Sequence, residues 1–259
     1  LRDERNSLPS AFVQNIHFYA DSRNIEFDTW VDWKQHQVLL KAEFDVDVNA
    51  NEATYDIQFG NLSRPTHANT MWDVAKFEVC AHKWADLSEG GYGVTILNDC
   101  KYGHSIREGH MTLTLLKSGI VPNPVTDQEE HTFTYALLPH MGGWREGNVP
   151  QAAYALNIPV RAAVAASKGQ GLPHSYVDVS AENVALETVK KAEDSDSTII
   201  RLYEFQNRRT EVTVKLADAF SKVEDCDLME NPEAEIPTDG HSFTFTVKPY
   251  EIKTFRLTK

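Results

Sequence analysis

The feature that most constrains the fold is a strict alternation of apolar and polar side chains over residues 40–48. The apolar positions are Leu40, Ala42, Phe44, Val46 and Val48, and the positions between them are Lys41, Glu43, Asp45 and Asp47. A period of two places one set on a buried sheet face and the other set in water. The segment therefore predicts a β-strand.

Similar patterns recur along the first two thirds of the chain, between turns rich in Gly, Pro, Asn and Asp. We expect strands over residues 25–33, 55–59, 77–82, 91–98, 111–116 and 132–138. Strands that follow one another without helical crossovers pair in an antiparallel way and stack as a sandwich. One short helix is expected over residues 149–156, with Asn148 as its cap and Pro159 beyond its end.

Residues 167–173 are small, polar and rich in Gly and Pro, a composition typical of a domain boundary. We therefore expect a large β-sandwich over residues 1–168 and a smaller one over residues 169–259. In the second domain, short strands are expected over residues 176–179, 184–189, 198–205, 211–216, 242–247 and 254–257. Six short strands in about ninety residues favour an immunoglobulin-like sandwich. The fold class is thus all-β.

Two acidic segments of the second domain, residues 224–227 and 231–235, are expected to be loops. They lack the regular one-three-five spacing of a calcium loop, so a solvated face is favoured over a calcium site.

The charge balance excludes two classes of partner. The chain has 38 acidic and 25 basic residues, a formal net charge of −13, which disfavours nucleic acid and anionic membrane surfaces. No apolar run approaches the roughly 20 residues of a membrane span. Three cysteines without a CxxC pair favour a reducing, cytoplasmic location. Because the chain begins at Leu1 within a charged segment, we expect it to be part of a longer protein.

Motifs that carry chemistry are missing from the sequence: it has no GxSxG, Walker, GxGxxG or HExxH pattern. His104 and His110 are expected on one strand, about 20 Å apart, and therefore as structural or solvent-exposed histidines. The run from residue 64 to residue 105 concentrates ionisable groups, and Asp86, Glu89 and Asp99 could meet across a turn as the carboxylate pair of a glycosidase. The alternative is a hydrogen-bonded loop that orders the sandwich edge.

Five tryptophans raise the alternative of an independent carbohydrate-binding module, because flat aromatic faces stack on sugars. They are Trp30, Trp33, Trp72, Trp84 and Trp144. Trp33 shares a face with the apolar residues of its strand and is expected in the core.

Several of these segments resemble the distal region of glycoside hydrolase family 38 α-mannosidases. The segments are residues 25–33, 55–60, 64–67, 77–79, 82–89, 91–94 and 97–103. The resemblance is specific over residues 12–141 and weaker over residues 174–259. It implies a galactose-mutarotase-like supersandwich followed by a small C-terminal sandwich.

The resemblance also implies what this chain lacks. In the family, the aspartate nucleophile, the acid/base carboxylate and the zinc ligands of the retaining mechanism lie on an N-terminal α/β barrel. We therefore assign no catalytic residue and no metal ligand here, place the zinc cofactor in the missing catalytic domain, and expect this chain alone to be inactive.

One loop of the family's sandwich reaches the rim of the substrate pocket, and residues 98–103 are similar to it. Asp99, Lys101 and Tyr102 are the candidate substrate-binding residues. Some relatives place an arginine directly after the aspartate, whereas this chain has Cys100, which cannot donate a charged hydrogen bond.

The expected function is that of the non-catalytic C-terminal part of a cytoplasmic α-mannosidase acting on mannose-containing oligosaccharides. Its expected partners are its own N-terminal barrel and the oligosaccharide. The alternatives are the carbohydrate-binding module and an assembly element whose exposed apolar patch marks the lost interface or a homodimer contact.

Overall fold

The computed structural model describes residues 9–164 and 174–259, and the chain divides into two compact units. The first unit is Leu1–Arg161 and the second is Ala162–Lys259. The boundary expected between residues 168 and 169 lies outside the described residues.

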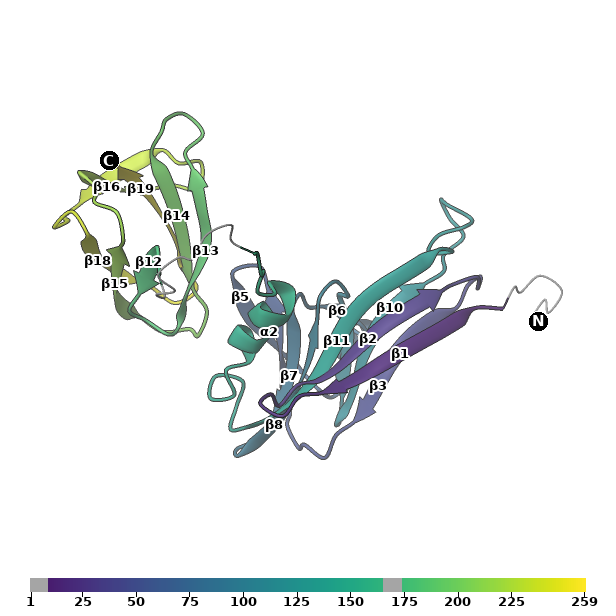
Figure 1. Ribbon diagram of the computed structural model, residues 1–259. Coiled ribbons are helices and arrows are strands. Elements are labelled where there is room, and N and C mark those ends of the chain that lie inside the picture. The colour runs from purple at the N-terminus through teal and green to yellow at the C-terminus, as the bar shows by residue number, and fades with distance from the viewer. Residues whose placement is uncertain (1–8, 165–173) are drawn as a thin grey trace. The chain divides into compact units, whose positions relative to one another are not determined.

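The first unit is built of two antiparallel sheets (Figure 1). The larger has the strand order β1-β2-β11-β8-β7-β4-β5, and the smaller has the order β3-β10-β9-β6. The larger sheet consists of β1 (Ala11–Phe18), β2 (Ile25–Asp32), β4 (Glu52–Ile57), β5 (Gly60–Pro65), β7 (Trp84–Ser88), β8 (Tyr92–Asn98) and β11 (Glu130–Met141). The smaller sheet consists of β3 (Leu39–Asp45), β6 (Val79–Cys80), β9 (Gly103–Arg107) and β10 (His110–Lys117).

The core of this unit is formed by one apolar face of each sheet. Val31, Ile96, Met111 and Leu113 are each 0 % exposed and belong to one apolar cluster. Trp33 also packs in this cluster, as its alternation predicted.

The second unit is a smaller antiparallel sandwich. Its three-stranded sheet consists of β12 (Val177–Val179), β15 (Thr210–Leu216) and β18 (Ser242–Val247). Its five-stranded sheet, in spatial order, consists of β13 (Val184–Lys191), β14 (Thr198–Glu204), β19 (Ile252–Thr258), β16 (Lys222–Cys226) and β17 (Pro232–Ile236). Phe255 packs against Phe243 and Phe245, whose ring centroids are 4.9 and 4.6 Å away. The expected all-β class of two successive sandwiches is confirmed.

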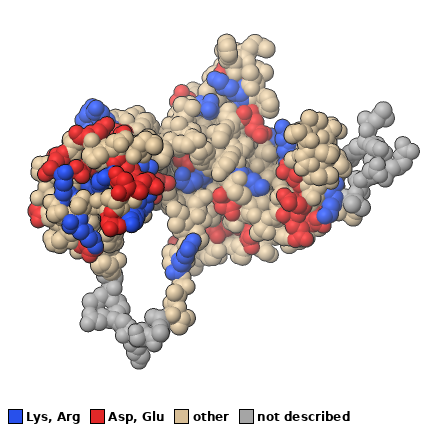
Figure 2. All heavy atoms as spheres, turned by 90° about the horizontal axis from the view of Figure 1, so that it is seen from above, with Lys and Arg blue, Asp and Glu red and all other residues tan. Residues whose placement is uncertain are grey.

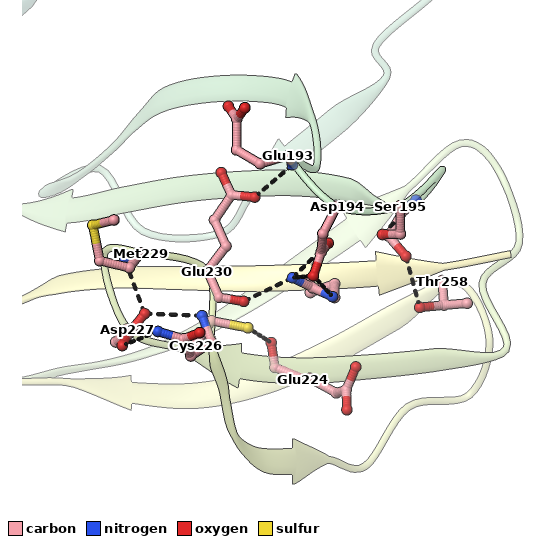
Figure 3. A network of polar contacts seen from close by, with 12 residues as sticks. Glu193, Asp194, Ser195, Glu224, Cys226, Asp227, Met229, Glu230 and Thr258 are labelled. Atoms are coloured by element: carbon pink, nitrogen blue, oxygen red, sulfur yellow. Dashed lines mark hydrogen bonds and ion pairs between the residues drawn. The ribbon is translucent and has the colours of Figure 1, made fainter.

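The expectation that the two acidic segments are loops is wrong. Most of their residues belong to the paired strands β16 and β17, where β17 lies at a sheet edge that tolerates Pro232 at its first position. The turn between the strands is held by its own carboxylates (Figure 3). Asp227 accepts from the backbone N–H groups of Met229 and Asn231, and Glu230 accepts from the N–H of Glu193 at 3.0 Å.

One prediction on local structure is also wrong, and a second is right only in part. His104 and His110 lie on two strands, β9 and β10, because Glu108 and Gly109 have positive φ angles of 46° and 84° and form a tight hairpin turn. The expected helix is present as α2 (Val149–Asn157) with Asn148 at its N-cap position, but Asn148 has φ 54° and its side chain makes no capping hydrogen bond.

The sequence patterns also missed elements. The strands β1, β5, β7 and β9 were not predicted, nor was the short helix α1 (Met71–Ala75), which begins with a capping box between Thr70 and Asp73. None of the helices in the described ranges is both long and apolar enough to cross a bilayer.

Candidate functional site at the end of strand β8

The three candidate residues lie in a turn that follows strand β8 and leads into β9. Asn98, the last residue of β8, is fully buried and organises this turn. Its side-chain oxygen accepts a hydrogen bond from the N–H of Lys101 at 2.7 Å, and its amide donates to the carbonyl of His82 at 2.9 Å. An asparagine side chain that bonds to the backbone a few residues on fixes a compact turn.

Asp99 ties this turn to the neighbouring strand β11. Its backbone N–H donates to the carbonyl of Thr134 at 3.1 Å, and its carboxylate accepts from the N–H of Thr134 at 2.9 Å. Burial and the neighbouring Asp99 carboxylate raise the pKa of the Cys100 thiol to about 11. Cys100 is therefore a neutral thiol near pH 7, so it supplies neither a nucleophile nor a cation.

Lys101 and Tyr102 are the cationic and the aromatic side chains of the turn. The ammonium of Lys101 lies 4.3 Å from the ring centroid of Phe133, a cation–π contact that holds this charge close to the sheet. Tyr102 is 55 % exposed, and its ring lies 5.3 Å from that of His82. The turn thus presents one cation and one aromatic hydroxyl beside the imidazole of His82.

His104 supports the turn from inside the sandwich. Its side chain is fully buried, and its Nε2 lies 3.5 Å from the side-chain nitrogen of Asn98. Burial lowers the pKa of His104 to about 4, although the nearby Glu78 opposes the shift. A neutral imidazole therefore lies beneath the turn at physiological pH, as expected of a structural histidine.

Lys83 and Asp56 lie next to the turn and were not among the predicted site residues. Asp56 accepts from the N–H of Lys83 at 2.8 Å, and the Lys83 ammonium lies 4.8 Å from the ring centroid of Tyr154 on α2. Burial raises the pKa of Asp56, and Lys83 opposes this shift. Asp56 alternates with Tyr55 and Ile57, so the pattern predicts a solvent-facing acid, and no signal in the sequence indicated this ion pair.

A buried cluster around Asp86 is the second polar feature of the first unit. Asp86 lies 2.8 Å from Nε2 of His140 and accepts from the hydroxyl groups of Thr95 and Ser88. Thr95 and Asp86 both face the same imidazole nitrogen, whereas a nucleophile triad needs the acid and the hydroxyl on opposite ring nitrogens. Because all but Ser88 are at most 2 % exposed, this cluster is a core support and not a reaction centre.

The three carboxylates among which a glycosidase pair was sought do not converge. Glu89 bonds to Tyr92 at the start of β8, whereas Asp99 follows Asn98 at its end, so seven strand residues, or about 20 Å, separate these two positions. Asp86 is buried against His140. A glycosidase needs two accessible carboxylates about 5 to 10 Å apart.

The described residues also provide no metal centre. They contain no group of three or more His, Cys, Asp or Glu side chains that could hold an ion. On the face that Figure 2 shows, basic side chains are interspersed with acidic ones.

The family models match both units. A model of the glycosyl hydrolases family 38 C-terminal domain matches residues 2–125, and a model of the family 38 C-terminal beta sandwich domain matches residues 183–255. The chain belongs to the C-terminal region of glycosyl hydrolase family 38. The resemblance of the chain to the distal region of family 38 is thus confirmed.

Curated relatives of this family 38 region are larger proteins. "Alpha-mannosidase 2C1" of Homo sapiens is 41 % identical over 90 % of this chain and 23 % of its own length. "Alpha-mannosidase G" of Dictyostelium discoideum is 36 % identical over 98 % of this chain and 24 % of its own length. The chain therefore spans about a quarter of the length of these relatives.

A solved structure shows the same fold. An alpha-mannosidase from Enterococcus faecalis V583 matches with a TM-score of 0.79 at 19 % identity, over 95 % of this chain and 28 % of its own. A second family 38 protein from Enterococcus faecalis matches with a TM-score of 0.76 at 18 % identity, over 95 % of this chain and 29 % of its own.

Proposed function

We propose that this chain is the non-catalytic C-terminal part of an α-mannosidase that removes terminal α-mannosyl residues from oligosaccharides. In this proposal it supports an N-terminal catalytic barrel of the same polypeptide, which acts in cytoplasmic mannose metabolism by a retaining mechanism. The observation that carries it is that both units match family 38 C-terminal models while Asp86, Glu89 and Asp99 do not converge as a glycosidase pair.

The zinc of the family's reaction belongs, in this proposal, to the absent barrel. The donor set of this chain does not fit the ion, because no group of three ligating side chains is present in the described residues. The contribution of this family 38 region to chemistry is therefore one of binding and orientation.

Residues 98–103 would contribute to the rim of the substrate pocket. Lys101 and Tyr102 would donate hydrogen bonds to sugar hydroxyls, and Tyr102 offers a partly exposed ring for stacking. The carboxylate of Asp99 accepts a hydrogen bond from the N–H of Thr134, so Asp99 fixes the turn. Such a fixed turn preserves the orientation of the two donors at little entropic cost.

The first experiment compares the 259-residue chain with the full-length protein that contains it, on an aryl α-mannoside with added zinc. We expect the full-length protein to release the aryl alcohol and the chain alone to release none. Turnover by the chain alone would overturn the proposal of a non-catalytic part.

The second experiment tests the pocket rim in the full-length protein. Tyr102→Ala should raise KM for a mannose oligosaccharide about tenfold, the effect of losing roughly 1.4 kcal/mol of binding. Tyr92→Ala is the matched control, because Tyr92 is a partly exposed tyrosine at the opposite end of β8. An unchanged KM for Tyr102→Ala would remove this turn from the substrate pocket.

A carbohydrate-binding module is the second candidate, and Trp72 is the observation that favours it. Trp72 is 77 % exposed, whereas Trp33, Trp84 and Trp144 are buried. Calorimetry with mannose oligosaccharides separates the two functions: micromolar binding by the chain alone, abolished by Trp72→Ala, would support the module.

A further inference from the structure

The two layers of the first unit are unequal, and this leaves one strand without a covering layer. The larger sheet has seven strands and the smaller has four. The edge strand β3 of the smaller sheet packs over β2 and β11, where Phe44 lies 5.7 Å from Phe27 and 6.3 Å from Tyr135 between ring centroids. In the described part of the sandwich, no strand of the smaller sheet follows β3 on that side, although β1 extends the larger sheet beyond β2.

The register of β1 shows which of its side chains face inward. Phe12 lies opposite Val31 and Ile16 lies opposite Phe27, and directly opposed residues point to the same face. Val31 is 0 % exposed in the core, so Phe12 and Ile16 lie on the core side of the sheet. Phe18 shares this face by the period of two.

These inward-facing side chains are nevertheless open to solvent. Phe12, Ile16 and Phe18 are 48, 52 and 74 % exposed, and we call these three residues the β1 strip. Between them, Gln14 donates to the hydroxyl groups of Tyr135 and Thr29 at 2.8 and 3.0 Å. The strand is therefore fixed to the sheet, and its apolar strip is a rigid surface.

The lengths of the relatives supply a candidate for the cover of the strip. The curated relatives are about four times as long as this chain, and both matching models are C-terminal domains, so the rest of those relatives precedes the matched region. Strand β1 is the first element that the structure describes, so the strip is the element nearest in sequence to that preceding part. The strip carries no charge and requires an apolar partner surface.

We propose that the β1 strip is the docking surface for the N-terminal part of the same polypeptide, which supplies the apolar side chains missing from the layer over β1. This inference rests on the proposed function, because it requires a preceding catalytic part. It adds the residues through which the sandwich holds that part. A second copy of this chain is the competing occupant.

Hydrogen exchange of the unmodified proteins gives the first test. Backbone amides of β1 should exchange at least tenfold more slowly in the full-length protein than in the 259-residue chain, because docking closes this sheet edge region to water. Equal exchange of β1 in the two proteins would overturn the proposal.

Substitution gives the second test. The combined change of Phe12, Ile16 and Phe18 to Ser should lower the unfolding temperature of the full-length protein and leave that of the chain alone nearly unchanged. Trp72→Ser is the matched control: Trp72 is as exposed as Phe18, and α1 connects β5 and β6, which lie at the sheet edges away from β1. An equal loss in both proteins, or the same loss from Trp72→Ser, would contradict docking at the strip.

Sedimentation of the chain alone tests the competing occupant. A monomer supports the proposal, whereas a dimer that the strip substitutions dissociate would assign the strip to a second copy. The docking proposal can fail while the proposed function holds. A full-length enzyme that hydrolyses mannosides but does not protect the amides of β1 from exchange would support the function and contradict the docking surface.

Discussion

The two units of this chain are both antiparallel sandwiches, but their strands differ in how many large apolar side chains they expose. Among the described strands of the second unit, Val189 is the exposed large apolar residue, whereas β1 of the first unit carries four: Phe12, Val13, Ile16 and Phe18. Phe12, Ile16 and Phe18 face inward on β1, which extends the larger sheet beyond the edge strand β3 of the smaller one. Their exposure thus follows from the lack of an opposite strand over β1.

The units also offer separate spectroscopic signals. All five tryptophans lie in the first unit, so their fluorescence reports its unfolding, while circular dichroism reports both units. Each prediction below uses this difference.

The largest effect is expected from Phe255→Ala in the second unit. Phe255 is 0 % exposed and packs against two phenylalanine rings, so its removal should cost about 4 kcal/mol of unfolding free energy. The dichroism transition should fall in temperature while the tryptophan transition stays in place. A joint shift of both signals would show that the two units unfold together and would contradict their separate stabilities.

A slightly smaller effect is expected from Asp86→Asn in the first unit. An amide cannot accept from all the donors around Asp86, so at least one buried group loses its partner at a cost of about 3 kcal/mol. Tryptophan fluorescence should show this loss. Asp45→Asn is the control, because the side chain of Asp45 is 91 % exposed, and a similar loss there would contradict the role of burial.

The third prediction concerns pH. Burial lowers the pKa of His104 from 6.5 to about 4, so the folded state favours the neutral ring. Its contribution is fully present above pH 6.5 and is lost as pH falls toward 4, by up to about 3 kcal/mol. Urea unfolding of the first unit, followed by tryptophan fluorescence between pH 7 and pH 4, measures this slope. The slope should flatten in His104→Gln, and an equally steep slope would contradict the assignment.

The smallest effect is expected from Glu230→Gln in the second unit. Lys190 and the N–H of Glu193 hold the pKa of the Glu230 carboxyl below 4.5. Its contribution is therefore present above pH 4.5 and lost as pH falls through the lowered value, and the partly exposed Lys190 limits it to about 1 kcal/mol. Circular dichroism should show that the second unit of the variant is less stable at pH 7. Its stability should also depend less on pH below 4.5. Loss of stability already between pH 6.5 and 5 would contradict this contrast with the first unit.

The sequence predicted most strands of both units but missed those whose pattern is not local. In β1, the polar Gln14 and Asn15 break the alternation, and its inner face is exposed, so no period-two signal points to a core. Strands β16 and β17 are rich in acids, which are depleted in strands, and their pairing with each other and with β19 overrides that preference.

The candidate site shows a similar division. Family resemblance indicated Asp99, Lys101 and Tyr102, and the structure brings them into one turn. The supports of that turn were not predicted as such, because Asn98, His104 and Thr134 act through contacts between strands. The ion pair of Asp56 and Lys83 likewise joins residues 27 positions apart.

The sequence by itself determined the all-β class and the succession of two sandwiches, because alternation and turn composition act over a few neighbouring residues. Only the tertiary structure decided which faces are covered. The contact of Asp86 with His140 spans 54 positions, and the exposure of Phe12 depends on how many strands the opposite sheet contains. Such long-range packing is not encoded in any short window of residues, and it determines both the support of the turn and the open strip on β1.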